Sequence, residues 1–258
     1  KRLPMNQALD HVFAALQHAI PQKQLTTWAN RIARQQTPWL KNLMIRAFAE
    51  TFSVNIAEAQ SGRAEDYASF NEFFTRPLKE GSRPFPSDPH HLACPSDGTI
   101  SQMGSIQDDR IFQAKGIDYS LQALLGAEDD WSKHYWNGSF CTIYLSPRDY
   151  HRVHMPLNGQ LLETRHIPGR LFSVNDASAR TIPGLFARNE RLVCRFQGDV
   201  GEFTLIMVGA MLVASIDTIW SGAVDWRKDG QIQHHDYREQ ALKFQRGDEM
   251  GRFNYGST

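Results

Sequence analysis

The segment 146–156, SPRDYHRVHMP, gathers two histidines, two arginines, an aspartate and a tyrosine. It follows an apolar run at 140–145 whose β-branched and aromatic residues predict a strand, and the Ser-Pro step ends that strand. His151 and His154 are three residues apart, so a regular strand would point them to opposite faces, whereas a bend would turn both toward one cavity. Histidine titrates near neutral pH, which suits proton transfer. The alternative is a pair of surface or hydrogen-bonded histidines.

A metal site is not predicted here, because neither an HExxH pattern nor a cysteine pair accompanies the two histidines. Asp97 precedes Gly98 in CPSDGTISQMG, and an aspartate in such a tight turn most often serves the turn itself. Gly256 and Ser257 adjoin near the end of the chain, where the pattern alone indicates a frayed terminus. Leu171 and Phe172 lie among turn residues, a composition suited to a pocket wall.

Composition excludes some classes of function. The 28 basic and 28 acidic residues cancel, and no aromatic-basic repeat occurs, so nucleic acid is not an expected partner. The three cysteines are odd in number and far apart, which favours a reducing compartment over a disulfide framework. No run approaches the ~20 apolar residues needed to span a bilayer.

Residues 1–60 are predicted to form amphipathic helices. They carry seven Lys or Arg against three acidic residues, a net charge of 7 − 3 = +4. Apolar residues at helical spacing, among them Phe13 and Trp28, predict two helices, and Thr37-Pro38 predicts the start of a third that begins near Trp39. Basic amphipathic helices with aromatic residues are typical of membrane-interface segments. The alternative is an ordinary helical cap, which is commoner on periodicity alone.

The remainder is predicted to be β-dominated, with strands at 140–145, 160–166, 191–196, 202–208, 211–220 and 223–226. A short helix capped by Ser120 is expected at 120–125. The fold class is therefore α+β. We divide the chain into a helical membrane-docking segment, 1–60, and a β-rich catalytic domain, 61–258.

Seven motifs in order, FNEFFTRPL, DGTIS, SPRDYHRVHMP, LFSVN, FARNER, VGAMLVASI and the final GST, resemble one family. They are similar to the phosphatidylserine decarboxylases of bacteria and mitochondria, over nearly the whole chain. The resemblance implies a pyruvoyl-dependent enzyme, made as a precursor that cuts itself between Gly256 and Ser257. Tyr255 stands where the family usually has an aliphatic residue, a difference that is expected either to slow cutting or to be a local variant.

The resemblance also implies residue roles. Asp97, His154 and Ser257 correspond to a self-processing triad, with His154 as the base that lets Ser257 attack the Gly256 carbonyl. Ser257 then becomes the pyruvoyl group, whose ketone condenses with the substrate amine and accepts electrons as carbon dioxide leaves. His151 corresponds to the residue associated with decarboxylation, as proton donor.

A diacyl substrate also favours membrane docking of the N-terminal helices. The expected location is peripheral, on the cytoplasmic face of the cell membrane, bound to anionic lipid through a surface that includes Phe13, Trp28 and Trp39. Leu171 and Phe172 are expected to help accommodate lipid. The resemblance further implies a small C-terminal subunit starting at Ser257 and extending beyond Thr258, and a homodimer of processed protomers. Two alternatives remain: an uncut serine hydrolase using Asp97, His154 and Ser257, and an inactive lipid-binding relative.

Overall fold

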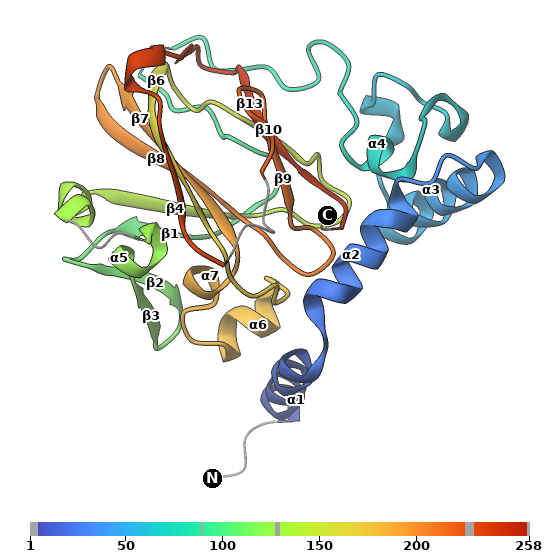
Figure 1. Cartoon of the computed structure of the whole chain (residues 1–258), viewed down its shortest axis with the longest axis horizontal. Coiled ribbons are helices and arrows are strands. Elements are labelled where there is room, and N and C mark those ends of the chain that lie inside the picture. Colours follow the sequence, from blue (N-terminus) through green and yellow to red (C-terminus); the bar gives the residue numbers. More distant parts are fainter. Residues whose placement is uncertain (1–4, 89, 127–129, 225–229, 257–258) are drawn as a thin grey trace.

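Helices come first along the chain and run along one flank of the molecule, with the sheets on the other side (Figure 1). The computed structural model describes residues 5–88, 90–126, 130–224 and 230–256. The first helices are α1 (Met5–Ala19), α2 (Gln22–Ala33) and α3 (Pro38–Phe52). Pro21 separates α1 from α2, since proline cannot donate the backbone bond that a continuous helix needs. Thr37 is the N-cap of α3 with Pro38 in its first turn, as expected from the sequence.

A second helical group packs against α3. Two single turns, η1 (Ile56–Glu58) and η2 (Ala64–Asp66), lead to α4 (Phe70–Phe74), which begins where the Ser69 hydroxyl accepts a 3.2 Å bond from the Glu72 amide. The phenylalanines of α4 are almost fully buried and join Ile45 of α3 in one apolar cluster. The helical layer is therefore held together by the aromatic FNEFF segment, which lies beyond the boundary at residue 60 that the sequence predicts.

Antiparallel sheets form the rest of the described chain. The largest has the order β11-β6-β7-β8, with β12 also on β6, and a second has the order β10-β9-β13-β5. Two two-stranded sheets complete the strands: the hairpin β2-β3, and β1-β4, whose strands are separated in the chain by that hairpin and by two short helices. Their bounds are β1 Thr99–Ser105, β2 Arg110–Ala114, β3 Ile117–Ser120, β4 Ser139–Tyr144, β5 Arg152–His154, β6 Gly159–Ile167, β7 Arg191–Gly198, β8 Gly201–Val208, β9 Ser215–Thr218, β10 Gly222–Ala223, β11 Gln233–Asp236, β12 Lys243–Phe244 and β13 Glu249–Asn254.

The main core lies between the two larger sheets. Leu161 of β6 and Phe196 of β7 pack there against Met250 and Phe253 of β13, and all four are at least nine-tenths buried. β7 lies in the middle of its sheet with neighbours on both edges, and it is buried along most of its length. The α+β prediction is confirmed: helices precede a sheet-rich domain, and β13 joins the last described residues to its core.

Short helices fill the ends of the sheets. They are α5 (Leu121–Leu125), η3 (Asp130–Tyr135), α6 (Asp176–Thr181), α7 (Leu185–Arg188) and η4 (Arg238–Gln240). The predicted cap of α5 is confirmed, because the Ser120 hydroxyl accepts a 3.0 Å bond from the Ala123 amide. Within the described residues, no helix is long and apolar enough to cross a membrane.

Candidate functional site

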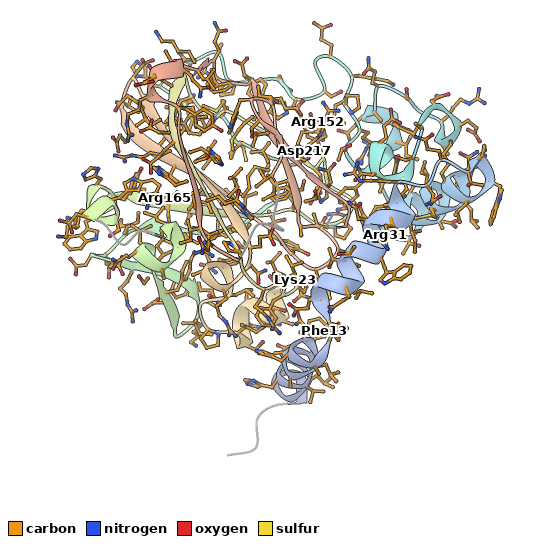
Figure 2. All side chains as sticks on the ribbon, viewed as in Figure 1. Phe13, Lys23, Arg31, Arg152, Arg165 and Asp217 are labelled. Atoms are coloured by element: carbon orange, nitrogen blue, oxygen red, sulfur yellow. The ribbon has the colours of Figure 1, made fainter. Side chains whose placement is uncertain are left out.

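The described chain ends in a central strand. β13 lies between β5 and β9, and Arg252 pairs in register with Arg152 on one side and Asp217 on the other. Figure 2 labels Arg152 and Asp217 on these two neighbouring strands. Beyond β13, the amide of Tyr255 donates a 2.8 Å bond to the side-chain oxygen of Asn71 in α4. Residues 254–256 are therefore fixed between the sheet and the helical layer, and the sequence-based interpretation of a frayed end is wrong for the residues up to 256.

Gly256 occupies a position that only glycine fits. Its φ is +78°, in the left-handed region, and an added Cβ would clash with the backbone of Asn30 in α2. Its amide donates a 2.6 Å bond to the Leu212 carbonyl, and its own carbonyl accepts a 3.2 Å bond from the Ser215 amide. Gly256 is thus clamped on both sides, and the carbonyl of the peptide that the sequence analysis places at the cut is held by the Ser215 amide. Ser257 itself lies outside the described residues.

His151 is a buried, neutral imidazole next to this clamp. It is 2% exposed, its ring centroid lies 4.0 Å from that of Phe74, and Phe74 in turn contacts the ring of Tyr255. Burial, the largest effect, lowers the pKa of His151 to about 4. The ring Nδ1 lies 2.8 Å from the Asp149 carbonyl and so must carry the hydrogen that it donates, which leaves a lone pair on Nε2.

His154 has a different set of neighbours. Its Nδ1 lies 2.8 Å from the Gly247 carbonyl, which requires Nδ1 to donate. Its Nε2 therefore accepts the 3.1 Å hydrogen bond from the Tyr150 hydroxyl. Burial raises the pKa of Tyr150 to about 12, so this hydroxyl keeps its proton near neutral pH. The tautomer of His154 is the one that a general base at Nε2 requires.

Asp97 pairs with an arginine instead of a histidine. Both carboxylate oxygens accept hydrogen bonds from Arg83, at 2.8 and 2.6 Å, and Arg83 also binds Glu58. These bonds, the Asp97 bond foremost, raise the pKa of Arg83. Among the described residues, the ring nitrogens of His154 contact Tyr150 and Gly247, so Asp97 makes no direct bond to that ring.

The strand register separates the two histidines along β13. His154 is opposite Glu249, whereas the carbonyl of His151 accepts a 3.0 Å bond from the Phe253 amide, nearer the cut. β5 connects them, since His151 directly precedes it and His154 is its last residue, and the β13 side of the pairing has a register shift between Glu249 and Gly251. A cavity nearby is lined in part by Asp97, Asp149 and Tyr150, and neither histidine is part of its wall. Asp97 therefore lines this cavity, whereas each histidine reaches it only through a lining residue, His154 through Tyr150 and His151 through Asp149. The assignment of the triad to Asp97, His154 and Ser257 stays a prediction.

α2 packs on the rest of the protein through its polar face. Gln22 accepts a 2.9 Å bond from the Leu171 amide, and the side-chain amide of Asn30 donates a 3.3 Å bond to the Tyr255 carbonyl. Its buried residues are Gln22, Thr26, Asn30 and Ala33. A helix on a globular domain normally buries its apolar stripe. In α2 the apolar stripe faces outward instead, which differs from the pattern expected of an ordinary helical cap.

The outward stripe continues across all three helices. Trp28 is 62% exposed and Trp39 is 69% exposed, and the guanidinium of Arg31 lies 5.6 Å from the Trp28 ring centroid. Figure 2 labels Phe13 on α1 and Arg31 on α2. We define the outer apolar face as Leu9, Val12, Phe13, Leu16, Ile20, Leu25, Trp28, Ile32, Trp39 and Leu43, all at least 36% exposed. An exposed apolar surface of this extent is typical of an interaction site.

The expectation that Leu171 and Phe172 contact lipid is wrong for this structure. They are 1% and 0% exposed, respectively. The Phe172 ring packs between the guanidinium groups of Arg170 and Arg188, against α1. Their role is to seat α1 on the domain. The turn residues around them favour exposure, and no local pattern indicates that α1, which is distant in sequence, covers Phe172.

Sequence reasoning missed Arg76, Arg83 and Asn30, which contact the candidate site. The sequence contains a signal for the first, because Arg76 directly follows the aromatic run of α4 in FFTRPL. Arg83 and Asn30 carry no local signal, since their partners are distant in sequence: Asp97 for one and Tyr255 for the other.

Comparison with known proteins shows the family to which the chain belongs. The family model for phosphatidylserine decarboxylase matches residues 70–258, and a second model, described as PSD, matches residues 12–53. The chain belongs to the phosphatidylserine decarboxylase family.

Individual relatives carry the same description. A protein of Methylococcus capsulatus is 48% identical over 96% of this chain and 86% of its own length. One of Methylobacillus flagellatus is 50% identical over 94% of this chain and 86% of its own, and one of Alkalilimnicola ehrlichii is 48% identical over 97% and 87%. Each is named a phosphatidylserine decarboxylase proenzyme. The family resemblance seen in the motifs is confirmed.

Proposed function

We propose that this chain is the precursor of an enzyme that decarboxylates phosphatidylserine to phosphatidylethanolamine, after cutting itself between Gly256 and Ser257. The observation that carries the proposal is the clamped Gly256: a left-handed glycine at the end of a core strand, with its carbonyl held by the Ser215 amide. A peptide carbonyl held in one position is the kind of substrate on which an intramolecular nucleophile is effective. The name proenzyme borne by the relatives agrees with it.

In the proposed cut, the Ser257 hydroxyl attacks the Gly256 carbonyl carbon and transfers its proton to Nε2 of His154. An ester replaces the peptide bond as the amide nitrogen takes up a proton. For this, Nε2 must exchange the Tyr150 hydroxyl for that of Ser257, and the end of β13 must approach His154. Asp97 would then stabilise the protonated ring. The hydrogen bond from the Ser215 amide would polarise the carbonyl and stabilise the developing oxyanion.

The proposed cofactor is the pyruvoyl group derived from Ser257, and the family's self-processing fits that origin. Such a group supplies a ketone that accepts electrons as the carboxylate leaves as carbon dioxide. The lone pair on Nε2 of His151 suits this setting: it can take a proton from the substrate ammonium and later return it to carbon. The low pKa of His151 means that it starts each cycle neutral, so we assign it the order base first, then acid.

The outer apolar face is the proposed contact with the membrane. Its tryptophans and phenylalanine suit the headgroup region, and the +4 charge of residues 1–60 favours anionic lipid. We place the enzyme peripherally, on the cytoplasmic face of the cell membrane. We further propose that the cut produces a small C-terminal subunit starting at Ser257 and that processed protomers form a homodimer.

Intact mass spectrometry of the purified full-length gene product tests the proposal. Two fragments are expected, and the second should begin with a blocked, ketone-bearing residue in place of Ser257. His154→Ala should leave one uncut chain, whereas His151→Ala should be cut yet release little carbon dioxide from phosphatidylserine. A single uncut chain with full decarboxylase activity would refute the proposal, and equal cutting defects in the two variants would refute the division of roles.

A further inference from the structure

A cavity of about 230 Å³ is separated from the two histidines by the residues that bind them. Its wall includes Tyr150, whose hydroxyl binds His154, and Asp149, whose carbonyl binds His151. The volume is below the ~300–1,000 Å³ of pockets that enclose drug-sized ligands. Six of its ten lining residues carry charged side chains, so it suits a small ionic group better than an acyl chain.

Arg76 is a buried cation in this wall, and no carboxylate in the described part of the chain pairs with it. It is 3% exposed, and its terminal nitrogens make only long contacts to neutral carbonyls, at 3.5 Å to Phe73 and 3.3 Å to Arg148. Its Nε has no hydrogen-bond partner within the described chain. Burial lowers the pKa of Arg76, which means that its charge is destabilised where it stands. A buried charge without a counterion is costly, and a bound anion would offset that cost.

The acidic side chains of the cavity are already occupied. Asp97 and Glu58 both bind Arg83, and one oxygen of Asp149 accepts bonds from the amide and hydroxyl of Ser146, each at 2.7 Å. Arg148 is the second available cation. Its side chain is 66% exposed, and the carboxylate nearest to it, that of Asp149, is 3.9 Å away. A buried and an exposed guanidinium therefore border the same space, and each has donors to spare.

We propose that Arg76 and Arg148 bind the phosphate of the phospholipid headgroup in this cavity, an inference that rests on the proposed function. Guanidinium groups match phosphate oxygens in both charge and geometry. The substrate carboxylate is the less suitable occupant, because holding it would stabilise the state that must lose carbon dioxide. The phosphate is unchanged by the reaction, so binding it would anchor substrate and product alike and orient the headgroup toward the histidines.

The direct test uses the uncut full-length precursor made with Ser257→Ala, so that it needs no pyruvoyl group. Titration calorimetry with glycerophosphoethanolamine and with inorganic phosphate measures binding to this chain. Arg76→Gln should weaken glycerophosphoethanolamine binding about 10- to 100-fold, the range for hydrogen bonds to a charged group. Arg148→Ala should weaken it less, because its side chain is exposed. Arg63→Ala, at a side chain that is 74% exposed and away from the cavity, is the matched control and should leave it unchanged.

Kinetics on the processed enzyme supply a second measurement. Arg76→Gln and Arg148→Ala should raise KM for a short-chain phosphatidylserine with little change in kcat, as expected when an interaction is equal in ground and transition states. Glycerophosphoethanolamine should compete with substrate. Tighter binding of glycerophosphoethanolamine than of inorganic phosphate identifies a headgroup site, and equal binding identifies a free-phosphate site and overturns the assignment to the lipid.

The outcomes separate this inference from the proposed function. Unchanged binding in both arginine variants, or a fall in kcat at constant KM, overturns the phosphate site while leaving the decarboxylase proposal intact. If glycerophosphoethanolamine binding depends on Arg76 but the chain with its natural Ser257 never cuts itself, the phosphate site is supported and only the proposed function is refuted. If circular dichroism shows that Arg76→Gln does not fold, the binding and kinetics of Arg148→Ala still test the phosphate site, because an exposed side chain is not needed for folding.

Discussion

His151→Asn is expected to reduce the loss of stability that the uncut chain suffers on mild acidification. The asparagine side chain keeps an N–H donor for the Asp149 carbonyl but does not titrate. In the wild-type chain, burial holds the pKa of His151 at about 4, below the value of about 6.5 for an unperturbed histidine. The unfolded chain therefore takes up the proton first as the pH falls.

The sign and the size of the stability change follow from this difference in the pKa of His151 between the folded and the unfolded chain. Stability from the neutral His151 is fully present above the unfolded pKa and is lost as the pH falls toward the folded one. Between about pH 7 and about pH 5 the loss amounts to about 2 kcal/mol, approaching about 3 kcal/mol below both pKa values. The asparagine variant lacks this contribution, so its free energy of unfolding should fall by about 2 kcal/mol less over the same interval.

Urea unfolding of the Ser257→Ala precursor at the two pH values, with and without His151→Asn, measures the effect. Following both tryptophan fluorescence and circular dichroism checks that the transition is cooperative. His134→Asn, at a side chain that is 58% exposed, is the control and should behave as the parent does. Equal losses of stability in the parent and in His151→Asn would show that His151 is not held neutral by burial.

Two further predictions concern the outer apolar face and the cut. Trp28→Ser and Trp39→Ser should each weaken binding to anionic vesicles about tenfold in a flotation assay, because each removes apolar area that would enter the interface. The thermal unfolding of both variants should be unchanged. Val200 is 85% exposed in the turn between β7 and β8, and the control variant Val200→Ser should bind the vesicles as the parent does. Equal vesicle binding by all three variants would refute the proposed docking surface. Gly256→Ala should stay uncut by mass spectrometry, because its Cβ would clash with α2, whereas Gly184→Ala, at φ +65° with open space around it, should still be cut.

Much of the fold can be predicted from local sequence patterns. The strands β4, β6, β7 and β8 lie within two residues of their predicted bounds, because their alternating or continuous apolar runs are long. The predicted strand 211–220 is confirmed only at β9, since Leu212 has a φ of +69° and lies in the turn closed by Ala210 and Val213. Of the predicted strand 223–226, Ala223 lies in β10, and residues 225 and 226 lie outside the described residues.

β13 was not predictable in the same way. Its sequence, EMGRFN, has little periodicity, and its partners β5 and β9 are distant along the chain, so tertiary contacts decide its structure. The candidate site likewise has a part that the sequence predicts and a part that depends on tertiary contacts. His151 and His154 stood out as a cluster, but the pairing of Asp97 with Arg83 and the isolation of Arg76 depend on contacts that only the folded chain brings together.

The position of Asn30 has a geometric consequence for how a lipid reaches the enzyme. Within about one turn of α2, Trp28 and Ile32 face outward while Asn30 contacts the Tyr255 carbonyl on the opposite side. With the outer apolar face resting on a bilayer, as proposed, only the thickness of one helix, about 10 Å, separates the scissile bond from the lipid surface. A headgroup would then travel a short distance to react, and its acyl chains would never leave their leaflet.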